Sequence, residues 1–185
     1  FSFVYLNKIE NKLFLCRDRL GQKPLYYFND SSRISFSSNL ISLKDITNQN
    51  QLDESSLFSY LNYGKTEGIS TIFKNLYQVD QGEMIVVDLQ DSLKVTKKNY
   101  WNLLNFYDDQ FFNEEEFFEL FSESVKLRTN SDVPFATFLS GGLDSTSIVK
   151  SQIDQNLEVN TFSVYMGNAS YDESYYCETA SNFYN

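Results

Sequence analysis

The sequence predicts an α+β part with an antiparallel sheet, followed by an α/β part with a parallel sheet. Before residue 40, short strand patterns follow one another too closely for parallel pairing, whose crossover needs a dozen or more residues. Between residues 133 and 165, a strand, a helix and a second strand follow one another, which indicates a parallel βαβ unit with a right-handed crossover. The two parts therefore differ in fold class.

The first part is expected to contain mainly short strands and one helix. Turn-forming residues at 29–32 separate two of the strand patterns. The helix starts after Asp53, which can cap it, and ends at Gly64, which suits the C-terminal cap. Its buried stripe is expected to be Leu57, Tyr60 and Leu61. The expected strands are residues 1–6, 12–16, 24–28, 33–37, 71–73 and 82–88, and residues 94–101 close this part.

The second part begins with a helix after residues 102–112, which show no clear period. Asn113 can cap this helix, and its acidic first turn is interpreted as a solvated helix start rather than a metal site. Its buried stripe is expected to be Phe117, Leu120, Phe121 and Val125. The expected elements that follow are a strand buried on both faces at 133–139, a helix at 145–155, a strand at 157–165 and a helix opened by a capping box at Ser170–Glu173.

The stretch from Ser140 to Thr146 joins the strand and helix of the βαβ unit and has the composition of an anion-binding loop. Its two glycines let backbone N–H groups come close to a ligand, and the free N–H groups of the first helical turn point the same way. A carboxylate at Asp144 would repel a phosphate there unless a cation lay between them, and Mg²⁺ is the natural candidate. The Gly-Lys-Ser/Thr of a Walker loop is absent, which argues against a common kinase or GTPase.

Composition excludes several classes of function. A formal net charge of −10 makes nucleic acid a poor partner, and the absence of histidine excludes Ser-His dyads and histidine-based zinc sites. The sequence contains no stretch of about 18 apolar residues, so no membrane span is predicted. Cys16 and Cys177 lack metal-ligand spacing and are expected to be free buried thiols in a reducing cytosol. The chain opens in a strand pattern and stops in a helical one, so an internal fragment of a longer protein is expected.

Several segments resemble known enzyme families. Ser140–Ser145, Ser-Gly-Gly-Leu-Asp-Ser, resembles the pyrophosphate-binding loop of ATP pyrophosphatases, which cleave ATP between its α and β phosphates and adenylate a substrate. Cys16–Tyr27 is similar to a scaffold segment in the N-terminal glutaminase domain of asparagine synthetases. Tyr100–Trp101 and Tyr171–Ser174 also resemble that family. In this order, the motifs resemble a glutamine-hydrolysing asparagine synthetase.

The resemblance implies the C-terminal part of a class II amidotransferase (glutaminase) domain at 1–101, a linker at 102–112 and the N-terminal part of an ATP pyrophosphatase-type synthetase domain at 113–185. It implies a cytoplasmic ligase of amino-acid biosynthesis that uses ATP, Mg²⁺, aspartate and glutamine, without nucleic acid or membrane partners, and it leaves a homodimer open. Aspartate would be activated as an acyl-adenylate and attacked by ammonia from glutamine.

The resemblance also assigns roles to single residues. Asp144 would ligate Mg²⁺, Leu139 and Val164 would contact the adenosine, and Asp172 is a candidate at the metal or substrate. No catalytic residue falls within the chain, because the family's nucleophile is an N-terminal cysteine to which neither cysteine here corresponds. The phosphates would be held by backbone N–H groups of Ser140, Gly141, Gly142, Leu143, Asp144 and Ser145.

Three other functions remain open. The family usually has Ser-Glu where this chain reads Ser37-Ser38-Asn39, which puts the substrate in question more than the fold. A related amide ligase with an inactive glutaminase half, such as a β-lactam synthetase or a peptide cyclase, is the nearest alternative. A tRNA-modifying pyrophosphatase shares the loop but predicts a basic surface and cysteine pairs, which this chain lacks. A non-enzymatic paralogue would keep only the fold. The fragment alone is expected to be inactive.

Overall fold

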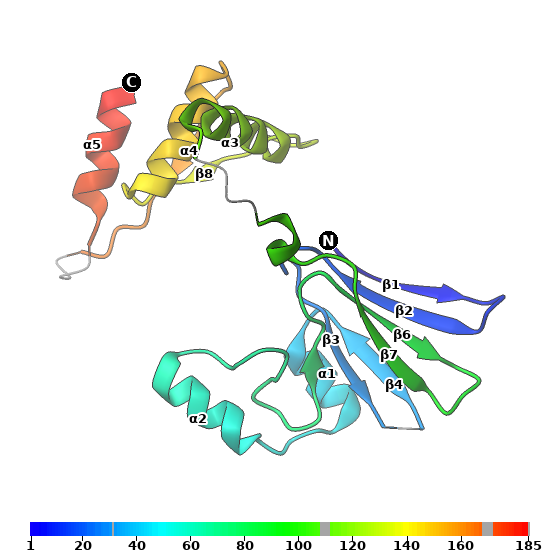
Figure 1. Ribbon diagram of the computed structural model, residues 1–185. Helices are drawn as coiled ribbons and strands as arrows, with labels where there is room; N and C mark the ends of the chain where they lie inside the picture. The colour runs from blue at the N-terminus through cyan, green and yellow to red at the C-terminus, as the bar shows by residue number, and fades with distance from the viewer. Residues whose placement is uncertain (31, 108–111, 168–171, 185) are drawn as a thin grey trace. The chain divides into compact units, whose positions relative to one another are not determined.

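The computed structural model describes residues 1–30, 32–107, 112–167 and 172–184, which divide into two compact units, Phe1–Asp108 and Asp109–Asn185 (Figure 1). Within the described residues, the first unit has two antiparallel sheets and two α-helices, and the second has three α-helices and one parallel pair of strands. None of the described helices combines the length and the apolar character needed to cross a bilayer.

Four strands of the first unit form an antiparallel sheet in the order β1-β2-β6-β7 (Figure 1). The register places Leu15 opposite Val4 on one side and Ile85 on the other. Leu13 and Leu15 are buried while Phe14 between them is half-buried, which is the period of two of a strand with one core face. The strands are β1 (Ser2–Asn7), β2 (Lys12–Arg17), β6 (Glu83–Asp88) and β7 (Lys94–Asn99).

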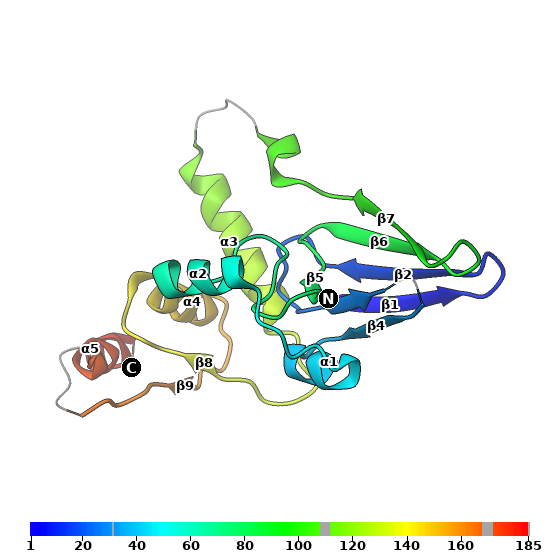
Figure 2. The same ribbon diagram turned by 90° about the horizontal axis from the view of Figure 1, so that it is seen from below.

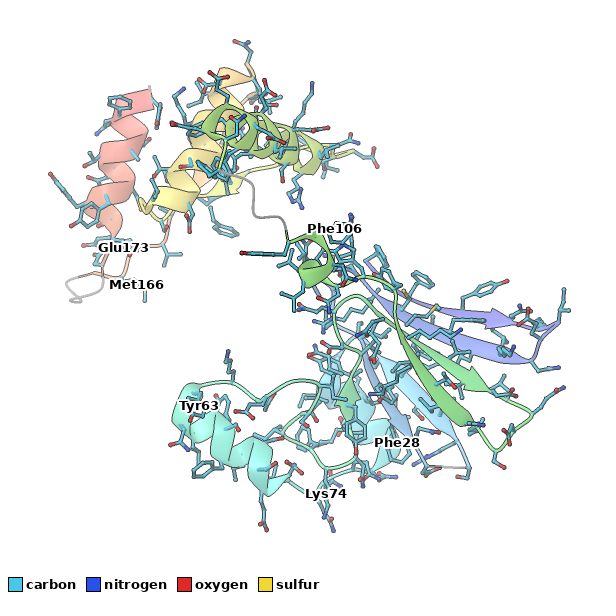
Figure 3. The ribbon with its side chains drawn as sticks, in the orientation of Figure 1. Phe28, Tyr63, Lys74, Phe106, Met166 and Glu173 are labelled. Atoms are coloured by element: carbon cyan, nitrogen blue, oxygen red, sulfur yellow. The ribbon has the colours of Figure 1, made fainter. Side chains whose placement is uncertain are left out.

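The core of the first unit lies between this sheet and a second one with the order β4-β3-β5. Tyr27 of β3 belongs to the main core cluster, together with Leu13, Leu15, Leu25, Val79, Ile85 and Val87. Phe28, the next residue of β3 (labelled in Figure 3), packs on the opposite face with Leu43 of helix α1 and with Leu76. Helix α1 lies beside this second sheet (Figure 2). β3 is therefore covered on both faces. These elements are β3 (Tyr26–Asn29), β4 (Ile34–Ser37), β5 (Tyr77–Gln78) and α1 (Leu40–Thr47).

Five of the six expected strands are confirmed, as β1, β2, β3, β4 and β6, and β7 forms within the segment expected to close this part. The strand expected at 71–73 is wrong. Thr71 turns the chain instead, since its hydroxyl lies 3.0 and 2.8 Å from the carbonyl oxygens of Phe73 and Leu76, and β5 follows. Helix α1 was not expected, although Asn39 caps its start and Asn48 ends it in the left-handed conformation.

Helix α2 (Glu54–Tyr63) has the predicted caps but not the predicted buried stripe. The Asp53 side chain accepts the N–H of Ser56, and Gly64 ends the helix with φ of 71°. Tyr60 and Leu61, however, are 51 % and 74 % exposed, whereas Ser56 is buried. The burial prediction is wrong for Tyr60 and Leu61, while Leu57 of the same stripe is half-buried. Among the residues of the helix, all of which the structure describes, only Ser56 is buried, in the polar first turn and outside the apolar stripe. A short 3₁₀ helix at Leu103–Phe106 follows β7.

The second unit packs helix α3 against helix α4. Its strands β8 and β9 pair in parallel, as predicted. Thr137 lies opposite Thr161, and Phe138 opposite Phe162. The predicted cap of α3 is confirmed, because the Asn113 side chain accepts the N–H of Glu116. The elements are α3 (Glu114–Arg128), β8 (Thr137–Phe138), α4 (Leu143–Asp154), β9 (Thr161–Phe162) and α5 (Ser174–Tyr184).

Burial in the second unit is lower than predicted. Thr137 faces α4, where its hydroxyl accepts a 2.9 Å hydrogen bond from Gln152, so Phe138 points to the other side and is 79 % exposed. The expectation of a strand buried on both faces is therefore wrong. In α3, Val125 is buried and Phe121 half-buried, but Phe117 and Leu120 are exposed because α4 packs along the second half of the helix, near Ser122.

Helix α5 begins later than the predicted capping box requires. Ser170 and Tyr171 lie outside the described residues. The helix starts at Ser174, whose N–H donates to the Asp172 carboxylate at 2.9 Å. Glu173 therefore precedes the helix instead of occupying its first turn, as Figure 3 shows, and the capping-box prediction is wrong.

Candidate functional site

The turn between β8 and α4 holds the residues that the sequence assigns to a phosphate site. Leu139 directly follows β8, is 3 % exposed, and donates its N–H to the Phe162 carbonyl at 2.9 Å. Gly141 then takes the left-handed φ of 75°. A Cβ on Gly141 would lie 2.6 Å from the carbonyl carbon of Tyr176 and 2.7 Å from the nitrogen of Cys177, so only glycine fits there.

Two serine hydroxyls bridge the ends of this loop. The Oγ of Ser145 accepts the N–H of Ser140 at 3.2 Å, lies 3.1 Å from the Oγ of Ser140, and donates to the Gly142 carbonyl at 3.2 Å. The Gly142 N–H is 3.5 Å from the Oγ of Ser140, at the limit of a hydrogen bond. The Ser140 N–H is thus paired inside the loop. It is therefore not free to bind a phosphate, which removes it from the predicted set of donors.

Four backbone N–H groups remain without a hydrogen-bond partner among the described residues. The first internal bond of α4 runs from the Thr146 N–H to the Gly142 carbonyl at 3.1 Å, and no side chain caps the helix. The N–H groups ahead of that bond carry the partial positive charge of a helix N-terminus. A Cβ on Gly142 would meet only the Oγ of Ser140, at 3.5 Å, so the space beside it is open. The free donors are those of Gly141, Leu143, Asp144 and Ser145.

Asp144 is exposed in the first turn of α4. The hydrogen bonds and ion pairs of this helix involve other side chains, such as the Lys150–Asp154 pair, and none within the described residues involves Asp144. The same residues contain no cluster of three or more potential metal ligands. Mg²⁺ is typically bound by one or two carboxylates together with phosphate oxygens and water. The site therefore fits a Mg²⁺ that arrives with a phosphate ligand, and it does not fit a metal held by protein groups alone.

A cavity of about 370 Å³ opens at the carboxyl ends of β8 and β9, where ligands bind in open α/β sheets. Leu139 and Val164, the two residues expected to contact adenosine, both line it. Met166 and Glu173 line it from the chain that leads into α5 (Figure 3), and Cys177 lines it from the helix itself. The structure thus brings Leu139, Ser140 and Val164 together around one cavity, whereas the other predicted residues, Gly141–Ser145, are not among those that line it.

A larger hollow of about 780 Å³ lies at the start of α3. Its charged groups are the carboxylates of Glu114 and Glu115, which have the same sign and sit in a first helical turn. Negative charge at that position stabilises a helix without any ligand. None of the described residues that line the hollow is positively charged, and its two carboxylates would repel a phosphate, so we do not assign the site there.

Sequence reasoning missed Ser163, Met166, Glu173 and Cys177 as residues that line the cavity. Ser163 and Met166 could have been found, because they follow β9 past its carboxyl end. Cys177 could not, because its place depends on how α5 returns toward the sheet. Both cysteines are free and buried, as predicted.

The Cys16–Tyr27 segment forms a closed turn around two charged side chains. The Arg17 guanidinium donates to three carbonyl groups, those of Gly21, Lys23 and Val79, at 2.6, 3.0 and 2.9 Å. The Asp18 carboxylate, 8 % exposed, accepts the N–H groups of Leu20, Gln22 and Lys23 at 3.2, 2.9 and 2.9 Å. Burial alone would raise the pKa of Asp18, but these N–H groups, together with the ammonium group of Phe1 at 3.2 Å, hold the pKa well below its ordinary value.

The Tyr100–Trp101 pair closes the first unit around Gly82. The Tyr100 hydroxyl donates to the Arg17 carbonyl at 2.6 Å, and the N–H groups of Tyr100 and Trp101 both donate to the Gly82 carbonyl. Gly82 has φ of 63°, and a Cβ there would collide with the Trp101 carbonyl oxygen. Asn39, which departs from the resembled pattern, caps α1 by accepting the Ser42 N–H at 2.9 Å.

Comparison with known families divides the chain into two matched regions. Residues 1–101, more than half of the chain, match the family described as "Glutamine amidotransferase domain". Residues 116–185 match the family described as "Asparagine synthase".

Curated relatives match most of the chain and extend well beyond it. Putative asparagine synthetase (glutamine-hydrolyzing) 2 of Methanocaldococcus jannaschii is 31 % identical over 99 % of this chain and 36 % of its own length. Asparagine synthetase (glutamine-hydrolyzing) 1 of Bacillus subtilis is 30 % identical over 89 % and 26 %. Amidase chry2 of Gibberella zeae is 27 % identical over 80 % and 22 %. The chain spans about a third of the length of these relatives, or less.

Proposed function

Because the chain belongs to the glutamine amidotransferase domain family and its second unit matches the asparagine synthase family, we propose that the protein is an ATP-dependent amide-forming ligase. It converts aspartate to asparagine through an acyl-adenylate, with ammonia from glutamine. Residues 1–101 serve the glutaminase half, 102–112 link the halves, and 113–185 serve the synthetase half. The order of the two matched regions and the relatives named as glutamine-hydrolyzing asparagine synthetases support this proposal.

The observation that carries the proposal is the set of free N–H groups in the 140–145 loop, beside the exposed Asp144 and the cavity. These groups would bind the β and γ phosphates of ATP, while Leu139 and Val164 frame the adenosine. Asp144 would hold Mg²⁺, whose charge offsets that of the phosphates. The open space beside Gly142 supports the same position, because the fold itself gives no steric reason for a glycine there.

The chemistry follows from these contacts. A side-chain carboxylate oxygen of aspartate attacks the α phosphorus, the bond to the bridging oxygen breaks, and pyrophosphate leaves with the electron pair. Negative charge therefore grows on the pyrophosphate, where the free N–H groups of the loop stabilise it. Ammonia then attacks the acyl carbon, AMP leaves, and a proton is lost to give the amide. No described residue is assigned to glutamine hydrolysis.

The test is Asp144→Ala in the full-length protein, assayed by aspartate-dependent exchange between ATP and pyrophosphate. Loss of the metal ligand should lower the exchange rate at least about 100-fold. Asp154→Asn is the matched control, because Asp154 lies at the other end of the same helix and pairs with Lys150. Exchange that survives Asp144→Ala unchanged would leave the loop with a structural role and would refute the proposal.

A second candidate is a related amide ligase with another acceptor and an inactive glutaminase half. It is favoured by the matches to proteins named amidases, chry2 and chyE, each over 80 % of this chain. The exchange assay separates the two candidates when aspartate is replaced by other carboxylates and glutamine by ammonia. Exchange that depends on aspartate, with glutamine as a nitrogen source, supports asparagine synthesis. Exchange with another carboxylate alone supports the second candidate.

A further inference from the structure

The carbonyl group of Leu139, immediately before the phosphate loop, is held by two side chains from separate segments. The Ser163 hydroxyl donates to it at 2.7 Å, and the Cys177 thiol at 3.1 Å. Both lone pairs of this oxygen are thus engaged, and the N–H of Leu139 is bonded to Phe162. The residue at which the chain leaves the sheet is fixed from both sides.

The same helix that carries Cys177 also fixes the next turn of the loop. Gly141 lies so close to α5 that a Cβ would reach the backbone of Tyr176 and Cys177. The loop therefore rests directly on the helix backbone, without side chains between them. Through these two contacts α5 determines both where the loop begins and where its N–H groups point.

We infer that Ser163 and Cys177 are positioning residues that hold the phosphate loop in its nucleotide-accepting conformation, with α5 as its support. This inference rests on the proposed function, since it concerns how the same loop binds ATP. Cys177 is 6 % exposed and lines the cavity, so the thiol lies between the nucleotide position and the helix backbone.

The two donors should act cooperatively. When one is removed, the Leu139 carbonyl keeps the other and loses one hydrogen bond of ordinary strength. When both are removed, a buried carbonyl is left without a partner, and that desolvation cost exceeds the loss of a single bond. The loop can relieve this cost by moving the carbonyl toward solvent, which would turn its N–H groups away from the phosphates.

The experiment measures the affinity of the full-length protein for Mg·ATP by titration calorimetry, with the melting temperature recorded for each variant. Ser163→Ala and Cys177→Ala should each weaken binding about threefold to tenfold, and the double variant should exceed the product of the two effects. Ser163→Thr and Cys177→Ser keep a hydroxyl donor and should restore most of the affinity. Glu178→Gln, an exposed neighbour on α5, is the control and should bind as the wild type does.

A second readout uses the chain's own cysteines. Mg·ATP should slow alkylation of Cys177 by a maleimide several-fold, as followed by mass spectrometry of the modified peptides. Cys16, which is also 6 % exposed but lies in the first unit, should react at an unchanged rate.

The outcomes separate the inference from the proposed function. Wild-type protein that binds Mg·ATP, with additive or absent effects in the variants and no protection of Cys177, refutes the inference alone. Wild-type protein that does not bind Mg·ATP refutes the proposed function and this inference with it. A variant that loses affinity only together with a lower melting temperature, and is not rescued by the hydroxyl replacement, also counts against a positioning role.

Discussion

Two turns of this chain each combine glycine with an aspartate, and they differ in their hydrogen bonding. In the turn after β2, the charged groups of Arg17 and Asp18 are used inside the turn, by backbone groups around Gly21. In the loop after β8, Asp144 and four backbone N–H groups have no partner among the described residues. A turn whose polar groups are satisfied needs no ligand to explain it, whereas the unsatisfied loop is where we expect one.

The two units also differ in how far their apolar side chains are buried. The first unit encloses its core between two sheets, with Leu15, Ile85 and Val87 fully buried. In the second unit, Phe138 and Phe162 of the parallel pair are 79 % and 64 % exposed. Substitutions in the satisfied turn should therefore change stability, and substitutions in the open loop should change ligand binding.

The largest effect is expected from the two neighbouring glycines of the loop. Gly141→Ala forces a Cβ into the backbone of α5 at a positive φ, so Mg·ATP binding should fall more than about 100-fold and stability by about 2–4 kcal/mol. Gly142→Ala meets open space in the free protein, so stability should change by less than about 0.5 kcal/mol.

The informative part of this pair is the binding of Mg·ATP to Gly142→Ala. A phosphate seated on the loop would meet the new Cβ, so affinity should fall about tenfold or more while the melting temperature stays unchanged. Calorimetry and thermal unfolding on the same samples give both quantities. Wild-type affinity in this variant would place the phosphates away from Gly142.

The reverse pattern is expected for Asp18→Ala in the satisfied turn. Loss of the carboxylate leaves three part-buried N–H groups without their acceptor, so the free energy of unfolding should fall by about 3 kcal/mol in urea titrations. Asp91→Ala, at an exposed hairpin of the same unit, is the control and should cost less than about 0.5 kcal/mol. Stability close to that of the wild type in Asp18→Ala would show that this turn is not a scaffold.

A smaller effect is expected from Gly82→Ala beside the Tyr100–Trp101 pair. The steric conflict with the Trp101 carbonyl adds to the strain of a positive φ, so we expect a loss of about 2–3 kcal/mol. Gly64→Ala has a similar φ with no atom within 4 Å, so it measures the strain alone and should cost about 1 kcal/mol. Equal losses in the two variants would mean that the close approach of Trp101 contributes nothing.

The smallest effect is expected in how the free energy of unfolding depends on pH in acid. The pKa of Asp18 lies below its ordinary value of about 3.9, so its carboxylate stabilises the folded state above that pH. This contribution is lost as the pH falls from about 3.9 toward the lower pKa of the folded state. Urea unfolding between pH 5 and pH 2.5 should therefore show a steeper loss for the wild type than for Asp18→Asn. Parallel curves would contradict the role of this carboxylate.

Local features were predictable from the sequence because local groups determine them. The sequence pattern identified five strands of the first unit, and the caps at Asp53, Gly64 and Asn113 stand where their side-chain chemistry places them. The order of buried strand, glycines and Asp144 identified the loop. The Ser145 hydroxyl that occupies the Ser140 N–H was not predictable, because it depends on the exact path of the turn.

Burial was the main failure, for one physical reason. A helical stripe such as Tyr60 and Leu61 shows which side is apolar, but it does not show whether another element covers that side. The same limit applies to Phe117 of α3. The position of Cys177 was missed for a different reason, because its contact with the Leu139 carbonyl joins residues that are 38 positions apart.

The central claim is that the free N–H groups of the 140–145 loop bind the phosphates of ATP. A crystal structure of the full-length protein with Mg²⁺ and a non-hydrolysable ATP analogue tests it most directly. We expect phosphate oxygens about 2.9 Å from the nitrogens of Gly141, Leu143 and Asp144, with no ligand at the Arg17–Gly21 turn. Phosphates bound elsewhere, with the loop nitrogens facing solvent, would contradict the account.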